Sequence, residues 1–291
     1  MLAALARASG MLVAASLLAF AMLRAMPGDP AEIALAAWNV AATPETVGAL
    51  RRQWGLDEAL PLQYLRWLGR FLSGDWGVSF RTGRPIATEM LQRAPLSATL
   101  GLGALALALA LAIPLGFFAA LRPGGSVDRL SRGLNVLSQS VPSFLLGLLL
   151  LWLLGVKLQL LRPFSGDPWT RLLLPTGLVA LYSAGTLARV YRAELLAVVR
   201  QPYFLTARAK GLGETRALWA HGHGAAFYGV VAALVPEFAW VVGGTAVTEV
   251  VFALPGLSQF LVQSIGARDY FGAFGANFVG ERRRVQYPVA V

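Results

Sequence analysis

Five long runs of apolar residues, separated by polar and basic stretches, organise this 291-residue chain. Each run is long enough to form a helix of several turns. The fifth run is interrupted by Pro236 and Glu237. A helix that crosses the apolar part of a bilayer needs about 20 residues, because each residue adds about 1.5 Å. The pattern therefore predicts an all-α polytopic membrane protein with about five transmembrane helices, at residues 8–23, 96–121, 133–156, 172–188 and 225–247.

The polar intervals between these runs predict which side of the membrane each part faces. Residues 27–95 are long and mixed, whereas residues 189–223 form a shorter and strongly basic interval. Short basic loops stay in the cytoplasm, while segments above about 60 residues are translocated largely regardless of charge. We therefore expect a first transmembrane helix at 1–26 with a cytoplasmic amino end, an external segment at 27–95, and a membrane core at 96–270 that contains the cytoplasmic loop 189–223.

The composition is that of a membrane protein, and its charge distribution argues against nucleic-acid binding. The chain is 56% hydrophobic with a mean hydropathy of +0.60, and only 14% of its residues are charged, against about a quarter in soluble domains. Its net charge of +10 comes from basic residues spread between apolar runs, which favours a role in membrane topology over nucleic-acid binding. We expect no nucleic-acid partner.

Candidate catalytic chemistry is sparse in this sequence. Cysteine is absent, so the chain has no disulfide, no thiol nucleophile and no thiolate metal site. The two histidines, His221 and His223, lie in one short glycine-containing stretch, which favours solvated loop residues over a metal pair. No serine–histidine–aspartate, metal-ligand or phosphate-binding pattern stands out. The sequence therefore predicts no enzyme, no catalytic residue, no metal site and no cofactor.

The most informative stretch is the basic interval at 189–223, with six basic and two acidic residues. Within it, Pro202 is suited to open a short helix and Gly211 to close it in the left-handed conformation. Small residues between them would let that helix lie close to another protein. On these grounds alone, an ordinary basic loop and a docking helix both remain open.

The segment Y-F-L-T-A-R-A-K-G-L at 203–212 resembles the ATPase-coupling loop of binding-protein-dependent ABC importer permeases, in the dipeptide/oligopeptide/nickel branch. The similarity continues in R-R-Q-W-G-L at 51–56 and in T-E-V-V-F-A-L-P-G-L at 248–257. The resemblance implies a short coupling helix that sits in a cleft of an ATPase subunit. The matching positions are Tyr203, Thr206, Ala207, Arg208, Ala209, Lys210, Gly211 and Leu212.

The resemblance also implies a function and a set of partners. The chain would be a permease subunit in the bacterial inner membrane that moves di- or oligopeptides, or nickel or another small solute, by alternating access. It would assemble with a second permease, two cytoplasmic ATPase subunits and a periplasmic substrate-binding protein. Two alternatives stay open: an ion-coupled transporter or channel without an ATPase, and a truncated, inactive permease.

Polar residues inside the apolar runs are candidates for lining a translocation path. Such residues at membrane depth normally face protein or water rather than lipid, so helix–helix hydrogen bonding is the alternative role. Glu249 is followed by Pro255-Gly256, which predicts that it lies where a helix gives way to irregular backbone. The candidates are Asn135, Gln139, Glu237 and Glu249.

The end of the chain departs from the family pattern. After I-G-A-R-D-Y at 265–270 the family has a sixth membrane helix, but residues 271–280 supply only ten uncharged residues. Ten residues cannot cross about 30 Å at about 1.5 Å per residue. We therefore predict that the last helix is missing or altered in the atypical tail 271–291.

Overall fold

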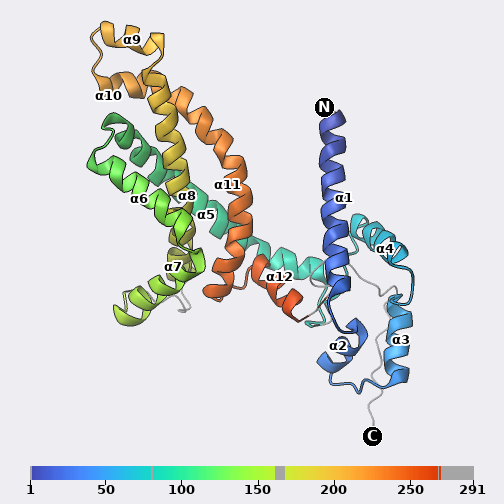
Figure 1. Cartoon of the computed structure of the whole chain (residues 1–291). Helices are drawn as coiled ribbons and strands as arrows, with labels where there is room; N and C mark the ends of the chain where they lie inside the picture. Colours follow the sequence, from blue (N-terminus) through green and yellow to red (C-terminus); the bar gives the residue numbers. More distant parts are fainter. Residues whose placement is uncertain (1, 80, 161–167, 268, 270–291) are drawn as a thin grey trace. The chain divides into compact units, whose positions relative to one another are not determined.

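The computed structural model describes residues 2–79, 81–160, 168–267 and 269, and helices account for most of them (Figure 1). The predicted all-α class is confirmed. Three helices of the described chain are long and apolar enough to cross a membrane, namely Ile86–Leu121, Arg171–Val199 and Glu214–Val251. A bent pair of helices adds a fourth if it is counted as one span, and Ala6–Met22 forms a shorter apolar helix.

Internal contacts divide the chain into two compact units. The first contains Met1–Gln92 and Phe260–Val291, and the second contains Arg93–Gln259. Two helices, α5 (Ile86–Leu121) and α12 (Leu257–Gly266), contribute residues to both units.

In the described part of the first unit, four helices precede α5. They are α1 (Leu2–Ala25), α2 (Pro30–Ala37), α3 (Pro44–Trp54) and α4 (Leu60–Leu72). Thr43 and Thr46 form a reciprocal capping box at the start of α3, and Gly55 ends that helix with a φ of 65°. The sequence Thr43-Pro44-Glu45 therefore begins α3.

Aromatic side chains build the interior of the first unit. Trp54 is 2% exposed and packs in a buried cluster with Leu50 and Phe260. A second cluster joins Phe20 of α1 to Tyr64 and Trp67 of α4. Trp54 and Trp67 therefore both belong to the interior of this unit.

The second unit is built around α8 (Pro168–Val199) and α11 (His223–Val251). The small side chains of Ala104, Ala108 and Ala112 on α5 are completely buried in one cluster with Leu187 of α8. Their four-residue spacing places them on one face of α5, so the backbone of α5 can approach closely. The other elements are α6 (Ser126–Ser140), α7 (Ser143–Leu150), α9 (Pro202–Ala209), α10 (Glu214–Ala217) and the π-helical turns Leu151–Lys157 and Leu218–Gly222.

Most of the predicted basic loop at 189–223 is helical. Helix α8 continues to Val199, and a helical segment that starts at Glu214 leads into α11. Only residues 200–213, which include α9, lie between these two long helices. Charged residues at the ends of the apolar runs therefore extend the helices instead of ending them.

The run at 133–156, predicted as one helix, is broken into two. Helices α6 and α7 meet at an angle of 107°. Val141, the residue before Pro142, is extended at φ −103° and ψ 124°. Proline disfavours the helical conformation in the residue before it and has no N–H to donate, so the helix stops here. The predicted tail, with its missing last helix, lies outside the described residues.

Candidate functional site

Helix α9 is a short, well-capped helix at the end of α8 that lies farthest from α7 (Figure 1). Pro202 occupies its first turn, as predicted, and Lys210 follows its last residue. The N–H of Gly211 donates to the carbonyl of Arg208 at 3.0 Å, and the N–H of Leu212 donates to that of Ala207 at 3.3 Å. With a φ of 88° at Gly211, this is a Schellman motif, and the predicted left-handed cap is confirmed.

The two faces of α9 have different surroundings. Phe204 and Ala207 are buried, and Phe204 belongs to the same cluster as Leu195, Val198 and Leu218. The opposite face is exposed over two turns and offers small, aromatic and cationic side chains. Of the predicted coupling residues, Ala207 faces inward and Leu212 is partly buried, whereas the exposed ones are Tyr203, Thr206, Arg208, Ala209, Lys210 and Gly211.

The two histidines occupy different environments. His221 is exposed, as predicted. His223 begins α11, stacks on Trp219 with the ring centroids 4.5 Å apart, and has Nδ1 2.5 Å from the hydroxyl of Tyr191. The prediction of a solvated loop residue is wrong for His223, because the helix turns its ring towards α8. Within the described residues, no group of three histidine, cysteine or acidic side chains could hold a metal ion.

The break between α6 and α7 is stabilised by a side chain of α8. The Tyr182 hydroxyl donates to the carbonyl of Val141 at 2.6 Å. Tyr182 itself is 6% exposed, and its ring stacks on Trp240 of α11 with the centroids 6.1 Å apart. A backbone carbonyl freed by a helix break needs such a partner when water is excluded. Side-chain contacts within the second unit therefore stabilise the break.

A small polar cavity lies beside this break. It has a volume of about 140 Å³ and is enclosed by α6, α8 and α11. Glu237 is the only carboxylate among its lining residues in the described chain. In membrane transporters, interrupted helices next to polar groups mark substrate and ion sites. The lining residues are Ser138, Gln139, Tyr182, Thr186, Glu237 and Trp240.

The structure brings two of the four predicted path residues together and places the other two elsewhere. Gln139 and Glu237 line the cavity. Asn135 lies one turn before Gln139 on α6, where Gly185 packs directly against its backbone. Glu249 is completely buried near the end of α11, as its predicted place before irregular backbone requires. Its carboxylate accepts a hydrogen bond from Ser97 at 2.6 Å and one from the N–H of Gln259 at 2.8 Å.

A buried carboxylate links the start of α6 to the end of α8 near α9. Asp128 is 1% exposed and forms an ion pair with Arg192, Nε to Oδ1, at 2.7 Å. It also pairs with Arg132 at 3.2 Å and accepts the N–H of Gly124 at 2.7 Å. Sequence reasoning used the arginines only as topology signals and missed this link. It also missed Tyr182 and Trp240, although Pro142 already signalled the break that Tyr182 caps.

Comparison with known proteins gives a consistent result over almost the whole chain. Residues 112–280 match a family described as binding-protein-dependent transport system inner membrane component. Residues 2–101 match the amino-terminal region of binding-protein-dependent transport system membrane components.

Individual relatives are similar over most of their own length. A Brucella abortus (strain 2308) protein named "Putative peptide transport system permease protein" is 36% identical over 272 residues, which cover 91% of this chain and 86% of the relative. The glutathione transport system permease protein of Escherichia coli (strain K12) is 33% identical over 255 residues, with 88% and 82% covered. The corresponding protein of Salmonella paratyphi A is 33% identical over 259 residues, with 89% and 84% covered.

Proposed function

This chain belongs to the binding-protein-dependent transport family, as an inner-membrane permease of the peptide branch of ABC importers, and from that premise we propose that it carries short peptides inward. It is a multi-pass protein of the bacterial inner membrane, in a family of transport permeases rather than of enzymes. The driving force in this proposal is ATP hydrolysis by partner subunits. Dipeptides and oligopeptides, glutathione included, are the proposed cargo, because relatives carry peptide and glutathione transport names.

The exposed face of α9 is the single observation that supports ATPase coupling best. Tyr203 and Thr206 lie one turn apart on the exposed side, followed by Ala209, while Arg208 and Lys210 add positive charge. The small side chains allow close contact with a partner groove, and the charges fix the direction of the helix in it. Docking into a cleft of a cytoplasmic ATPase requires these properties.

The contacts of α9 with its neighbours can transmit a movement of the ATPase subunits to α8 and α11. Phe204 is packed in one cluster with Leu195 and Val198 of α8 and Leu218 before α11. Packed interiors shift as discrete units and do not deform continuously. When two ATPase subunits close on ATP, they move α9, and α8 and α11 move with it. The movement needs a difference in docking free energy between the two ATPase states.

The cavity beside the helix break is the proposed part of the translocation path. It lies between α6, α8 and α11, the last two of which carry α9 between them. Rocking of these helices around a fixed polar point gives alternating access. Glu237 supplies a carboxylate there, and the amino-terminal ammonium group of a peptide is its natural counter-charge. Gln139 adds hydrogen-bonding capacity for the peptide backbone.

Three kinds of protein partner follow from this proposal. A second permease completes the translocation path, two cytoplasmic ATPase subunits bind the coupling helices, and a periplasmic binding protein delivers the peptide. The relatives are named as components of transport systems, which supports this arrangement. The lipid bilayer is the fourth kind of partner, and the proposal includes no nucleic acid.

The proposal is tested by cross-linking from α9 in the membrane. The chain contains no cysteine, so Ala209→Cys introduces a unique thiol on the exposed face. We expect this thiol to cross-link to an ATPase subunit, with a yield that changes when ATP is added. Glu45→Cys, exposed in the first unit, is the control and should give no such product.

Two outcomes would contradict the proposal. Labelling of Lys210 by a membrane-impermeant amine reagent from the periplasmic side would place α9 on the wrong face. Uptake that follows an ion gradient and survives Arg208→Ala with Lys210→Ala would favour an ion-coupled transporter instead.

A further inference from the structure

Helices α6 and α8 contact each other at both ends of α6 and in the middle. Near the start of α6, Arg192 of α8 reaches Asp128, with Nε 2.7 Å from Oδ1 and with Nη2 donating to Oδ2 at 3.1 Å. In the middle, a Cβ on Gly185 would lie only 3.1 Å from Cα of Asn135, so the two backbones are close. At the end of α6, the Tyr182 hydroxyl donates to the backbone at the helix break. Residues that advance along α6 meet residues that go back along α8, which is the register of antiparallel helices.

The face of α6 that meets α8 is polar. Asp128, Ser131, Asn135 and Ser138 recur every three or four residues, so they lie on one face of the helix. Asp128 and Ser131 are 1% and 2% exposed. Small and polar side chains allow membrane helices to approach closely and to bond to each other. This face therefore favours movement of α6 together with α8 over sliding of one helix along the other.

The Asp128 carboxylate also fixes the turn between α5 and α6. Its Oδ2 accepts the N–H of Gly124 at 2.7 Å, and Gly124 has a φ of 80°. Arg132, one turn later on α6, lies 3.2 Å from the same oxygen, but its side chain is 61% exposed, against 23% for Arg192. A buried ion pair keeps its geometry when further hydrogen bonds hold the carboxylate, as the turn does here. Arg192 is therefore the inner partner of a fixed carboxylate.

This ion pair lies between α9 and the cavity beside the helix break. Val199 ends α8 seven residues after Arg192, and Thr186, which lines the cavity, comes six residues before it. On α6, Gln139 of the cavity follows Asp128 by eleven residues, about 17 Å at about 1.5 Å per residue. Two connections therefore join the end of α8 to the cavity: α8 itself, and the ion pair followed by α6.

We propose that Asp128 and Arg192 are positioning residues for transport, because their ion pair makes α6 move together with α8 when α9 is displaced. Gln139 on α6 and Thr186 on α8 then shift as one wall of the cavity. Packed interfaces of this kind move between discrete arrangements and do not stretch. The inference rests on the proposed coupling through α9 and adds that coupling requires α6 as well as α8.

The test replaces the ion pair with a chemical link. The chain contains no cysteine, so Asp128→Cys with Arg192→Cys gives two unique thiols and leaves neither buried charge without its partner. A bifunctional methanethiosulfonate reagent joins the two helices again, and a reducing agent releases them. The permease is assayed in proteoliposomes with its partner subunits and binding protein, and the measured quantity is peptide taken up per ATP hydrolysed.

Breaking the connection should uncouple hydrolysis from uptake. In Asp128→Cys with Arg192→Cys, ATP hydrolysis should continue, while uptake per ATP falls by about two-fold or more, the lower end of the effect of mutations in coupling networks. The bifunctional reagent should restore the wild-type ratio, and reduction should lower it again in the same sample. A role in folding alone would not give a reversible response, because the folded protein is the same before and after linking.

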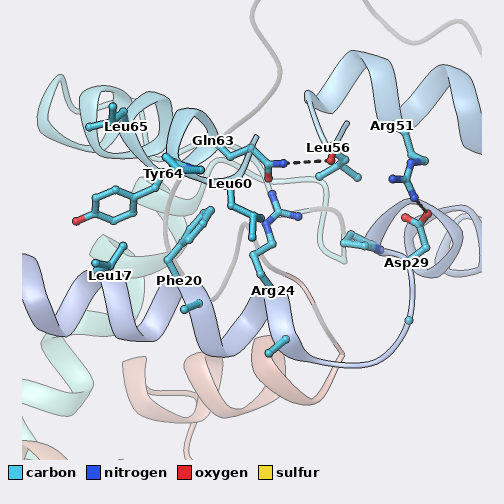
Figure 2. Close-up of a pocket in the computed structure, with 15 residues that line it drawn as sticks. Leu17, Phe20, Arg24, Asp29, Arg51, Leu56, Leu60, Gln63, Tyr64 and Leu65 are labelled. Carbon is cyan, nitrogen blue, oxygen red and sulfur yellow. Dashed lines mark hydrogen bonds and ion pairs between the residues drawn. The ribbon is translucent and has the colours of Figure 1, made fainter. Parts of the chain in front are cut away.

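A second ion pair of the chain provides the matched control. Asp29 accepts the N–H of Ala31 at 2.8 Å and pairs with Arg51 at 2.5 Å (Figure 2), so it also combines a backbone bond with an arginine. This pair belongs to the first unit, which contains neither α8 nor α9. Asp29→Cys with Arg51→Cys should lower the Tm but leave uptake per ATP unchanged, with or without the reagent.

Two results would overturn the inference. One is a wild-type ratio of uptake to hydrolysis in unlinked Asp128→Cys with Arg192→Cys. The other is a lowered ratio that stays low after mass spectrometry shows that the link has formed. If the double variant does not reach the membrane, Arg192→Lys decides: it keeps the charge but loses the planar two-nitrogen contact, and a wild-type ratio in this variant would equally overturn the inference.

The premise is tested separately. As long as the thiol of Ala209→Cys cross-links to an ATPase subunit, failure of the inference leaves the proposed coupling through α9 intact. Loss of that cross-link in a chain with Asp128 and Arg192 unchanged would instead remove the coupling role of α9.

Discussion

The carboxylate of Glu249 occupies the space directly above Gly256. A Cβ at Gly256 would lie 2.5 Å from Glu249 Oε1, so only glycine leaves room for it. From this position Glu249 accepts hydrogen bonds from Ser97 and from the N–H of Gln259. Ser97 in turn accepts the N–H of Leu257 at 2.8 Å. Two orphan donors in the first turn of α12 are thereby satisfied by α11 and α5.

The first prediction is that Gly256→Ala destabilises the protein. The added methyl group forces the Glu249 carboxylate away from Ser97 and Gln259, and overpacking of this kind costs about 1–3 kcal/mol. Thermal unfolding of the purified protein should show a lower Tm. Gly243→Ala on α11 is the matched control, because a Cβ there meets no atom within 4 Å. An equal Tm for both variants would show that Gly256 is not needed for this space.

The second prediction concerns the cap of α9. Gly211→Ala places an L-residue in the left-handed conformation, which costs about 1–2 kcal/mol, and should loosen the end of α9. ATP hydrolysis should then continue while peptide uptake falls. Gly213→Ala is the control, since Gly213 has a φ of −60° and open space around it. The measurement is the ratio of peptide taken up to ATP hydrolysed in proteoliposomes, and a bulky residue at Ala209 should lower it further.

If Gly211→Ala and Gly213→Ala give the same ratio of uptake to hydrolysis, the shape of the cap has no part in coupling. Membrane insertion should be normal in both variants, because the two glycines lie outside the buried cluster of the second unit.

The third prediction is that Glu237→Gln weakens peptide uptake without affecting insertion. The amide keeps the size of the side chain but loses the charge that pairs with a peptide ammonium group. Charged hydrogen bonds contribute about 1.5–3 kcal/mol, so we expect the apparent KM for uptake to rise about ten-fold or more. Peptides with an acetylated amino end should show no difference between the two proteins. Glu45→Gln, an exposed carboxylate, is the control, and an unchanged KM in Glu237→Gln would remove this residue from the path.

The fourth prediction concerns the helix break. Tyr182→Phe deletes the donor to the Val141 carbonyl and leaves that carbonyl buried, at a cost of about 1–3 kcal/mol. The Tm should fall, and uptake should fall with it if α6 and α7 change their angle. Tyr228→Phe, which removes a hydroxyl from a side chain that is 79% exposed, should behave as wild type. A wild-type Tm for Tyr182→Phe would mean that another donor caps the break.

Local signals in the sequence were enough to predict several elements. Pro202 and Gly211 marked the ends of α9, because capping depends on a few consecutive residues. The apolar runs predicted the long helices, since the hydrophobic pattern decides which segments enter a membrane. The fold class followed from these runs alone.

Relationships between distant residues were beyond this kind of reasoning. The pairing of Tyr182 with Val141, of His223 with Tyr191 and of Asp128 with Arg192 depends on how three helices are rotated about their axes. Helix rotation is set by packing, and a single sequence does not fix it. The break at Pro142 is different: its local signal was present, but the apolar run around it suggested one continuous span.

Helix α8 runs without interruption from the cavity to the residues that precede α9, the proposed coupling helix. Thr186 lines the cavity, and thirteen residues later Val199 ends α8, about 20 Å away at about 1.5 Å per residue. Each residue also turns the helix by about 100°, so the length of α8 sets the direction in which α9 points relative to the cavity. Two extra residues in this interval would rotate α9 about the axis of α8 by more than half a turn. Seven extra residues would bring α9 back to nearly the same direction. A change in the length of this interval therefore keeps the direction of α9 only when it adds or removes nearly whole turns.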